Sequence, residues 1–359
     1  MPQPMQDPLS DAPPPTPWAV PFDDRATAAD IAACFRLILG RNPNPEEWPG
    51  HSARAGEPLA AVVSSYVNSL EFARRRLQDP DGTPPARADL DGFSILASPE
   101  DAAVGQTVLA GMYEPDVVAV FRRVLRPGMN VLDIGGNIGF FSMLSASIVG
   151  PTGSVFTVEP NPANARMAEA SRRLNGFGHM TVFQAAAGRA TGMLVLNSSF
   201  SNGTTSAVDG DAVLGATTVP CVALDSVVPA DRPIHLIKLD VEGAEYNALL
   251  GCQGVIARDR PALVFEFGPG QLQGISGVTG EELLQWVTAQ GYTLAVIQPD
   301  GSTAPAGRDV EAVMQAYRDR GVDHIDVFAE PDPVAPPAPP RFMDRLRAAW
   351  RGATAALRQ

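Results

Sequence analysis

Residues 131–141 read VLDIGGNIGFF, and this stretch decides the fold. A short apolar run typical of a buried strand contains Asp133 near its end, turns through Gly135 and Gly139, and opens an apolar helix. Glycine lets the backbone approach a ligand closely, and a helix N-terminus favours a negatively charged group there. The stretch therefore predicts a strand, a ligand-binding loop and a helix in succession.

The spacing of the glycines separates two kinds of cofactor loop. A dinucleotide-binding loop carries three glycines as G-x-G-x-x-G, whereas residues 133–139 read D-x-G-x-N-x-G, with Asn137 in place of the middle glycine. This form is typical of loops that bind S-adenosylmethionine, and Asp133 suits the ammonium of that cofactor better than a pyrophosphate. A nicotinamide-dependent oxidoreductase is therefore the weaker alternative.

The next two strands complete the expected cofactor site. Residues 155–158 form a strand-like run, and Glu159 follows it about twenty residues past the loop, where an acid accepts both ribose hydroxyls in adenosine-binding sheets. The third strand ends in small residues that leave room for a flat adenine. The cofactor residues predicted in this way are Asp133, Gly135, Asn137, Gly139, Glu159, Ala185 and Ala186.

Strand-like and helix-like runs alternate between residues 90 and 330, which predicts a doubly wound α/β domain with a mostly parallel sheet. The strand-like runs are 130–134, 154–158, 180–185, 193–196, 218–223, 235–239, 262–267, 293–298 and 325–329. The helix-like runs are 116–125, 138–148, 162–175, 243–257 and 281–290. No long periodic helix is visible in 299–324, so we expect the last two strands to pair antiparallel. The expected fold is a seven-stranded, Rossmann-like methyltransferase sheet with an antiparallel final strand.

Smaller segments flank this domain. Residues 1–22 are proline-rich and are expected to be disordered, 23–79 to form a small all-α module, and 80–89 to form a linker. After the domain, 331–340 read as a proline-rich spacer. Residues 341–359 follow as a basic amphipathic helix, which suits either an anionic membrane surface or the acidic surface of its own domain.

Composition disfavours several classes of protein. The net charge is −13 at pH 7, which argues against a nucleic-acid partner, because such proteins need a basic face to neutralise phosphates. The three cysteines, Cys34, Cys221 and Cys252, lie far apart and are expected to be buried thiols rather than a disulfide or a zinc site. No secretory signal or membrane span is apparent. We therefore expect a cytoplasmic protein. Contact of 341–358 with the inner face of the membrane and docking of the same segment on its own domain stay open as alternatives.

Four further stretches are distinctive: GMYEP at 111–115, the loop within 126–139, LDSV at 224–227 and HLIKLDVEGAE at 235–245. Together they resemble the FkbM family of S-adenosylmethionine-dependent methyltransferases. The resemblance covers residues 90–330, implies O-methylation of sugar or polyketide hydroxyls, and adds Tyr113 to the cofactor site. Gly136 stands where alanine is usual in the family, a departure expected to matter little.

The helical module also carries a resemblance. Residues 36–43, RLILGRNP, and 69–72, SLEF, resemble a small bacterial helical domain of unknown function. That domain is often fused to enzymes of cell-surface carbohydrates, which favours a glycan as the acceptor.

The fourth strand and the helix after it carry the candidate catalytic residues. Asp240 ends the strand beside the expected methyl position and is the first candidate for a base or an acceptor-orienting group. Lys238 points to the same face, and a buried lysine requires a partner, which we expect to be Glu266 on the fifth strand. Glu242 completes the catalytic set. For Glu242 and Glu245 the alternative is a favourable charge at a helix N-terminus.

Three further features are weighed. The carboxylates Asp240, Glu242 and Glu266 are compatible with magnesium, but nothing in their spacing requires a metal, and no metal ligand is predicted. His324 begins the last strand, and its expected place at the active edge of the sheet makes it a catalytic candidate. The polar loop at 200–206 is expected to cover the acceptor.

Together these observations predict a methyltransferase that uses S-adenosylmethionine to O-methylate a hydroxyl of a sugar in a bacterial glycan. The alternatives are a non-catalytic carbohydrate-binding or scaffold protein on the same fold, and an N-methyltransferase of a small metabolite.

Overall fold

A computed structural model describes residues 23–69, 71–72, 84–199, 202–207 and 217–332. The chain divides into two compact units, residues 1–82 and 83–359. The predicted proline-rich start at 1–22, most of the spacer at 331–340 and the amphipathic helix at 341–359 lie outside the described residues.

The first unit is built from helices. They are α1 (Ala28–Leu37), α2 (Trp48–Ser52) and α3 (Leu59–Val67). The side chain of Thr27 caps α1, and Phe35 packs with Val62 and Tyr66 in a small core. Helix α3 ends at Val67, and Asn68 follows it as the C-cap.

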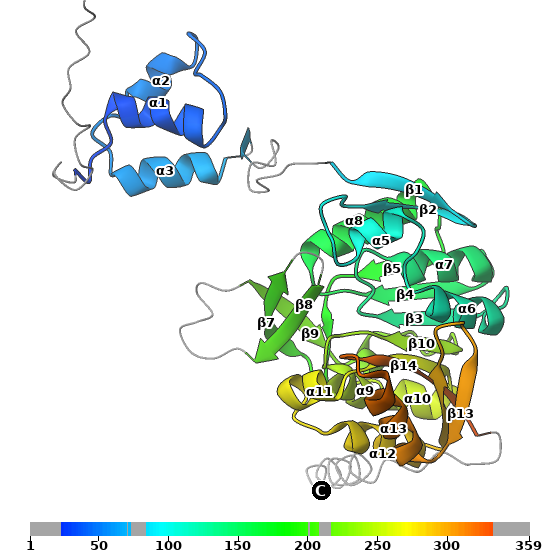
Figure 1. Ribbon diagram of the computed structural model, residues 1–359. Coiled ribbons are helices and arrows are strands. Elements are labelled where there is room, and N and C mark those ends of the chain that lie inside the picture. Colours follow the sequence, from blue (N-terminus) through cyan, green and yellow to red (C-terminus); the bar gives the residue numbers. More distant parts are fainter. Residues whose placement is uncertain (1–22, 70, 73–83, 200–201, 208–216, 333–359) are drawn as a thin grey trace, which may run out of the picture. The chain divides into compact units, whose positions relative to one another are not determined.

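The second unit contains an eight-stranded sheet in the order β13-β12-β14-β11-β10-β3-β4-β5 (Figure 1). Its strands are β3 (Asn130–Ile134), β4 (Ser154–Val158), β5 (Met180–Phe183), β10 (Leu236–Leu239), β11 (Ala262–Phe267), β12 (Tyr292–Ile297), β13 (Thr303–Gly307) and β14 (Ile325–Pro331). The run from β5 to β11 is parallel, and β14 inserts antiparallel between β11 and β12. The predicted antiparallel pairing of the last two predicted strands is confirmed.

Helices cover both faces of this sheet, which confirms the doubly wound α/β fold. On one face lie α6 (Pro115–Val124), α7 (Phe140–Val149) and α8 (Pro162–Leu174). On the other lie α9 (Glu245–Leu250), α10 (Gln253–Asp259), α12 (Gly280–Ala289) and α13 (Val310–Arg320). Successive strand residues point to opposite faces of the sheet. Val131 therefore packs in the core beneath α6 and α7, and Leu132 packs in the core beneath α9, α10, α12 and α13.

Several elements differ from the expectation. The strand β13 and the helix α13 occupy the segment 299–324, so the sheet gains an eighth strand. Helix α13 buries Val313 and Met314 but is otherwise rich in charged residues, which hid its periodicity. The helix expected over 243–257 is divided into α9 and α10 around Gly251 and Cys252.

Two smaller sheets lie beside the main one. A hairpin of β1 (Ala86–Leu90) and β2 (Phe93–Ala97) begins inside the predicted linker. The runs expected at 193–196 and 218–223 belong to a separate four-stranded sheet in the order β6-β9-β7-β8. Its strands are β6 (Ala186–Ala187), β7 (Gly192–Ser199), β8 (Asn202–Ala207) and β9 (Thr218–Val222).

The three cysteines are buried free thiols, as expected. Within the described ranges, no helix has both the length and the apolar character that a membrane span requires.

Candidate cofactor and acceptor site

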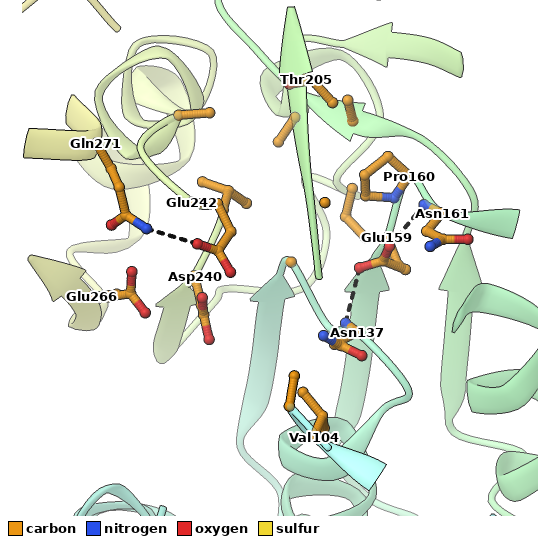
Figure 2. A pocket seen from close by; sticks show the side chains of 18 of the residues that line it. Val104, Asn137, Glu159, Pro160, Asn161, Thr205, Asp240, Glu242, Glu266 and Gln271 are labelled. Atoms are coloured by element: carbon orange, nitrogen blue, oxygen red, sulfur yellow. Dashed lines mark hydrogen bonds between the residues drawn. The ribbon is translucent and has the colours of Figure 1, made fainter. Parts of the chain in front are cut away.

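A cavity opens at the carboxyl ends of β3, β4, β10 and β11, the edge at which open α/β sheets bind ligands. Figure 2 shows Glu159 and Asn137 on one side of it, and Asp240, Glu242 and Glu266 on the other. We call the first side the cofactor half and the second the acceptor half.

Backbone geometry explains the glycine loop. Gly135 has a φ of 80°, and a Cβ there would overlap the carbonyl oxygen of Asp240. Only glycine therefore lets the loop after β3 pass the end of β10. Asn137 also adopts a left-handed φ, 49°, and its backbone N–H donates to Oε2 of Glu159 at 2.9 Å.

Glu159 is the central acid of the cofactor half. Its second oxygen, Oε1, accepts from the backbone N–H of Asn161 at 2.7 Å. Burial raises the pKa of Glu159 to about 7, and the hydrogen bonds from Asn161 and Asn137 oppose that rise. A carboxylate held in this way presents acceptor oxygens to the cavity, as a ribose requires.

Asp133 lies in a narrow recess beside the main cavity, together with Tyr113 and Lys238. Its Oδ2 accepts from the hydroxyl of Ser142, whereas its Oδ1 is buried and receives no hydrogen bond from the described residues. A buried acceptor without a donor is costly. The ammonium of a bound cofactor would supply the missing donor.

Two predicted cofactor residues do not line either cavity. Gly139 instead starts α7 and packs against α8, where a Cβ would lie 2.9 Å from Cβ of Ala168. Ala185 is fully buried in the core. The predicted pair of small residues was Ala185 and Ala186, whereas the pair that lines the cavity is Ala186 and Ala187.

The structure also corrects the view of Gly136. A Cβ at this position would overlap Cγ2 of Thr157, whose Oγ1 lies 2.6 Å from Oγ of Ser142. Ser142 in turn donates to Asp133 in the recess. A side chain at position 136 would therefore displace Thr157 and, through Ser142, disturb Asp133. The departure from the usual alanine therefore does matter.

The expected pair of Lys238 with Glu266 is wrong. Nζ of Lys238 lies 2.7 Å from Oδ2 of Asp240, two residues along the same strand, and 4.7 Å from the centroid of the Phe141 ring. Burial alone would lower the pKa of Lys238, but the carboxylates of Asp240, Glu114 and Asp133 raise it above its ordinary value. The lysine is therefore a permanent cation that neutralises one of the surrounding acids.

The acids after β10 have different roles. Glu242 lines the cavity, and its Oε2 accepts from Nε2 of Gln271 at 2.8 Å. Glu245 is buried and accepts from the backbone N–H groups of Val241 and Gly243. Glu245 therefore has a structural role in the turn into α9, whereas Glu242 faces the cavity.

Glu266 faces His324 instead of the lysine. Nε2 of His324 lies 3.8 Å from Oε2 of Glu266, and both residues line the acceptor half. Burial, together with the charges of Asp240 and Glu242, raises the pKa of Glu266 to about 10. Glu266 therefore carries a proton at neutral pH and offers a hydrogen-bond donor.

Sequence reasoning missed several residues of the site. Glu114 and Asp326 are half-buried acids near Lys238, and desolvation raises the pKa of each to about 7. Glu114 lies in the stretch GMYEP, so the family resemblance could have identified it. Asp326 and Gln271 lie in no motif, so no sequence signal pointed to them. From the polar loop and the hairpin beside it, Gly203 and Thr205 line the cavity.

The carboxylates of the acceptor half are the candidates for a metal site. Among the described residues, no three His, Cys, Asp or Glu side chains come together in a metal-binding group. Asp240 instead pairs with Lys238, Glu242 accepts a hydrogen bond from Gln271, and Glu266 is protonated.

Residues 133–294 match the methyltransferase FkbM domain. This segment is a methyltransferase FkbM domain. The match begins at Asp133 and spans β3 to β12, which includes Glu159 and Asp240. The resemblance to the FkbM family is confirmed, whereas that of residues 36–43 and 69–72 stays a prediction.

Curated relatives match this chain over shorter stretches. A protein-L-isoaspartate O-methyltransferase of Methanopyrus kandleri is 32% identical over 130 residues, which are 34% of this chain and 54% of that protein. A protein of the same name from Ignicoccus hospitalis is 34% identical over 123 residues, 34% of this chain and 56% of that protein. The chain thus spans about half the length of the curated relatives it matches.

Solved structures give distant matches. The crystal structure of methyltransferase FkbM from Methylobacillus flagellatus aligns over 84% of this chain and 60% of that one, with 14% identity and a TM-score of 0.37. Cofactor-bound Rv0187 from MTB aligns over 81% and 98%, with 16% identity and a TM-score of 0.35.

Proposed function

We propose that this protein is an S-adenosylmethionine-dependent methyltransferase that O-methylates an uncharged hydroxyl, most simply a hydroxyl of a sugar in a glycan. The observation that carries the proposal is the division of one cavity into two halves. The cofactor half presents Glu159 and the recess at Asp133, and the acceptor half presents carboxyl, amide and imidazole groups.

The residues present fit the cofactor. Oδ1 of Asp133 lacks a donor that an ammonium would provide, and the oxygens of Glu159 suit the hydroxyls of a ribose. Gly135 keeps the loop free of side chains at the point where the two halves meet. When bound, the cofactor supplies an electrophilic methyl group.

The charge of the acceptor half favours a neutral acceptor over an anionic one. Its walls carry the carboxylates of Asp240, Glu242 and Asp323, together with protonated Glu266. The lysine nearby, Lys238, is already bound to Asp240. A carboxylate such as an isoaspartyl side chain, which the names of the curated relatives indicate for those proteins, would meet like charges without a free cation. Hydroxyls, by contrast, can donate to these oxygens.

The chain's own groups perform three tasks in this proposal. Asp240, held by Lys238, accepts a hydrogen bond from the acceptor and fixes its orientation toward the cofactor half. Glu242 and its partner Gln271 form the wall beside it, and Gly203 and Thr205 limit the entry of water.

An amine acceptor is the second candidate, because an acidic wall also attracts an ammonium. Product analysis separates the two acceptors. The full chain, tritiated S-adenosylmethionine and cell-envelope fractions are incubated, and the labelled product is hydrolysed. A labelled methyl ether of a sugar supports the proposal, whereas a labelled methylamine or methyl ester contradicts it.

Calorimetry tests the cofactor independently of the acceptor. We expect S-adenosylmethionine and S-adenosylhomocysteine to bind and NAD to show no heat. A protein that binds NAD, or neither methyl-donor species, would contradict the proposed cofactor. A protein that binds the cofactor but labels no fraction would favour the non-catalytic alternative.

A further inference from the structure

The imidazole of His324 lies at the acceptor half of the cavity. Strand β14 runs antiparallel to β11, with Ile325 paired to Phe267, so the residue before Ile325 reaches the carboxyl edge of the sheet. His324 lines the acceptor half there, and 43% of its side chain is exposed. It therefore touches both the cavity and the solvent.

The two ring nitrogens have different surroundings. Nδ1 lies 3.1 Å from Oδ1 of Asp323, which also accepts the backbone N–H of His324. Nε2 receives no hydrogen bond from the part of the chain that the structure describes, and its distance of 3.8 Å from Glu266 is too long for one. A carboxylate at Nδ1 favours the tautomer with the proton on Nδ1, which leaves a lone pair on Nε2.

The other groups of the acceptor half are less suited to remove a proton. Oδ2 of Asp240 is bound to Lys238, and Oε2 of Glu242 accepts from Gln271. Glu266 holds a proton of its own at neutral pH, because burial raises its pKa to about 10. The imidazole of His324, by contrast, has an Nε2 that is free to accept a proton, and histidine is the most common general base in enzymes.

We propose that His324 is the catalytic base of the methyl transfer and that Asp323 is its positioning residue. The proposal rests on the proposed function, because it assigns the proton of the acceptor hydroxyl. It differs from the first sequence-based choice, Asp240, which keeps the orienting role.

The geometry permits one hydroxyl to meet both neighbours. A hydroxyl oxygen can lie about 2.8 Å from two atoms that are themselves 3.8 Å apart, so it can donate to Nε2 of His324 and accept from protonated Glu266. In the reaction the acceptor oxygen forms a bond to the methyl carbon and loses its proton to Nε2. The carbon–sulfur bond breaks, and its electron pair stays on the sulfur. The imidazolium then releases the proton to solvent through its exposed edge.

Three acidic groups face His324. They are Glu266 on β11, Glu242 in the turn after β10, and Asp323 beside it. Among them, Asp323 contacts Nδ1 of His324, and Glu266 lies on the side of Nε2.

The tautomer of His324 tests the proposal without any acceptor. The full chain has four histidines, so the His324→Gln variant assigns the His324 signals in protein labelled with ¹⁵N-histidine. At a pH where the ring is neutral, we expect the proton on Nδ1 and a bare Nε2, and we expect Asp323→Asn to weaken this preference. A proton on Nε2 in the wild-type protein would overturn the proposal.

Chemical rescue tests the role in catalysis. With the labelled envelope fraction as acceptor, His324→Ala should lower the rate by about 10²–10⁴-fold, the range for loss of a general base, while its affinity for S-adenosylmethionine is unchanged. Added imidazole should restore part of the rate in proportion to its unprotonated fraction. A matched control is His179→Ala, because His179 precedes β5 at the opposite edge of the sheet and bonds to the carbonyl of Ala146.

The outcomes separate this proposal from the function on which it rests. A His324→Ala variant that keeps the wild-type rate, or that imidazole does not rescue, would overturn the role of His324. A labelled product other than a methyl ether would instead contradict the acceptor class. If no fraction is labelled, the tautomer measurement decides the assignment alone.

Discussion

Gly136 and Thr157 should be energetically coupled, because they compete for one volume. A Cβ at position 136 would overlap Cγ2 of Thr157 and would lie 3.4 Å from Oδ2 of Asp133. The φ of Gly136 is not positive, so the backbone itself accepts alanine. The cost of Gly136→Ala is therefore a packing cost.

The magnitude follows from three terms. Overpacking of a buried site costs about 1–3 kcal/mol. Replacing glycine reduces the conformational entropy of the unfolded chain, which stabilises the fold by about 0.4–1 kcal/mol. The net effect of Gly136→Ala should therefore be a free energy of unfolding that is lower by about 0.5–2 kcal/mol. Thr157→Ser removes Cγ2, keeps the hydroxyl bonded to Ser142, and should cost about 1 kcal/mol for the lost methyl group. In the double variant the new methyl fills the vacated volume, so the coupling energy should be about 1–2 kcal/mol in favour of the pair.

Urea unfolding of the wild type, both single variants and the double variant measures this coupling. The transition to follow is the one that S-adenosylmethionine shifts, since the chain has two compact units. Gly178→Ala is the matched control, because a Cβ there meets nothing within 4 Å. Additive single effects, within about 0.3 kcal/mol, would refute the shared volume. The affinity for S-adenosylmethionine should fall in Gly136→Ala and recover in the double variant.

Three further predictions concern the site and the chain end. Because burial raises the pKa of Glu159 to about 7, this carboxyl stabilises the fold below pH 4.5 and loses that contribution as pH rises through 7. Affinity for S-adenosylmethionine should show the reverse, increasing from pH 6 to 8, and Glu159→Gln should weaken it by about 1–3 kcal/mol and abolish this pH dependence in calorimetry. Asp240→Asn should lower turnover by about 10²-fold in the labelling assay with little change in cofactor affinity; a wild-type rate would exclude its orienting role. Full-length protein should float with anionic liposomes at low salt, and a chain ending at Asp332 should not; equal flotation would contradict membrane contact through 341–358.

Local backbone demands made much of the cofactor half predictable. Gly135 must be glycine because the loop passes the carbonyl of Asp240, and Glu159 must follow its strand because the next strand ends at the same edge. Such requirements act over a few residues and leave a recognisable spacing. The alternation of strands and helices likewise predicted the doubly wound sheet, since buried strands are short and apolar.

Other features depended on side-chain contacts between distant segments. Lys238 turns along its own strand to Asp240 instead of crossing to Glu266, and no spacing distinguishes the two partners. The helix α13 was hidden because only Val313 and Met314 of its residues are buried.

The sequence by itself determined the methyltransferase sheet, the glycine loop and the acid after the second strand, because each depends on local backbone geometry. Only the tertiary structure decided the acceptor half. There His324 comes from the start of the final strand and meets Glu266 because β14 inserts antiparallel beside β11. Burial then sets which of these acids keeps its proton, and burial is a property of the assembled sheet rather than of any segment.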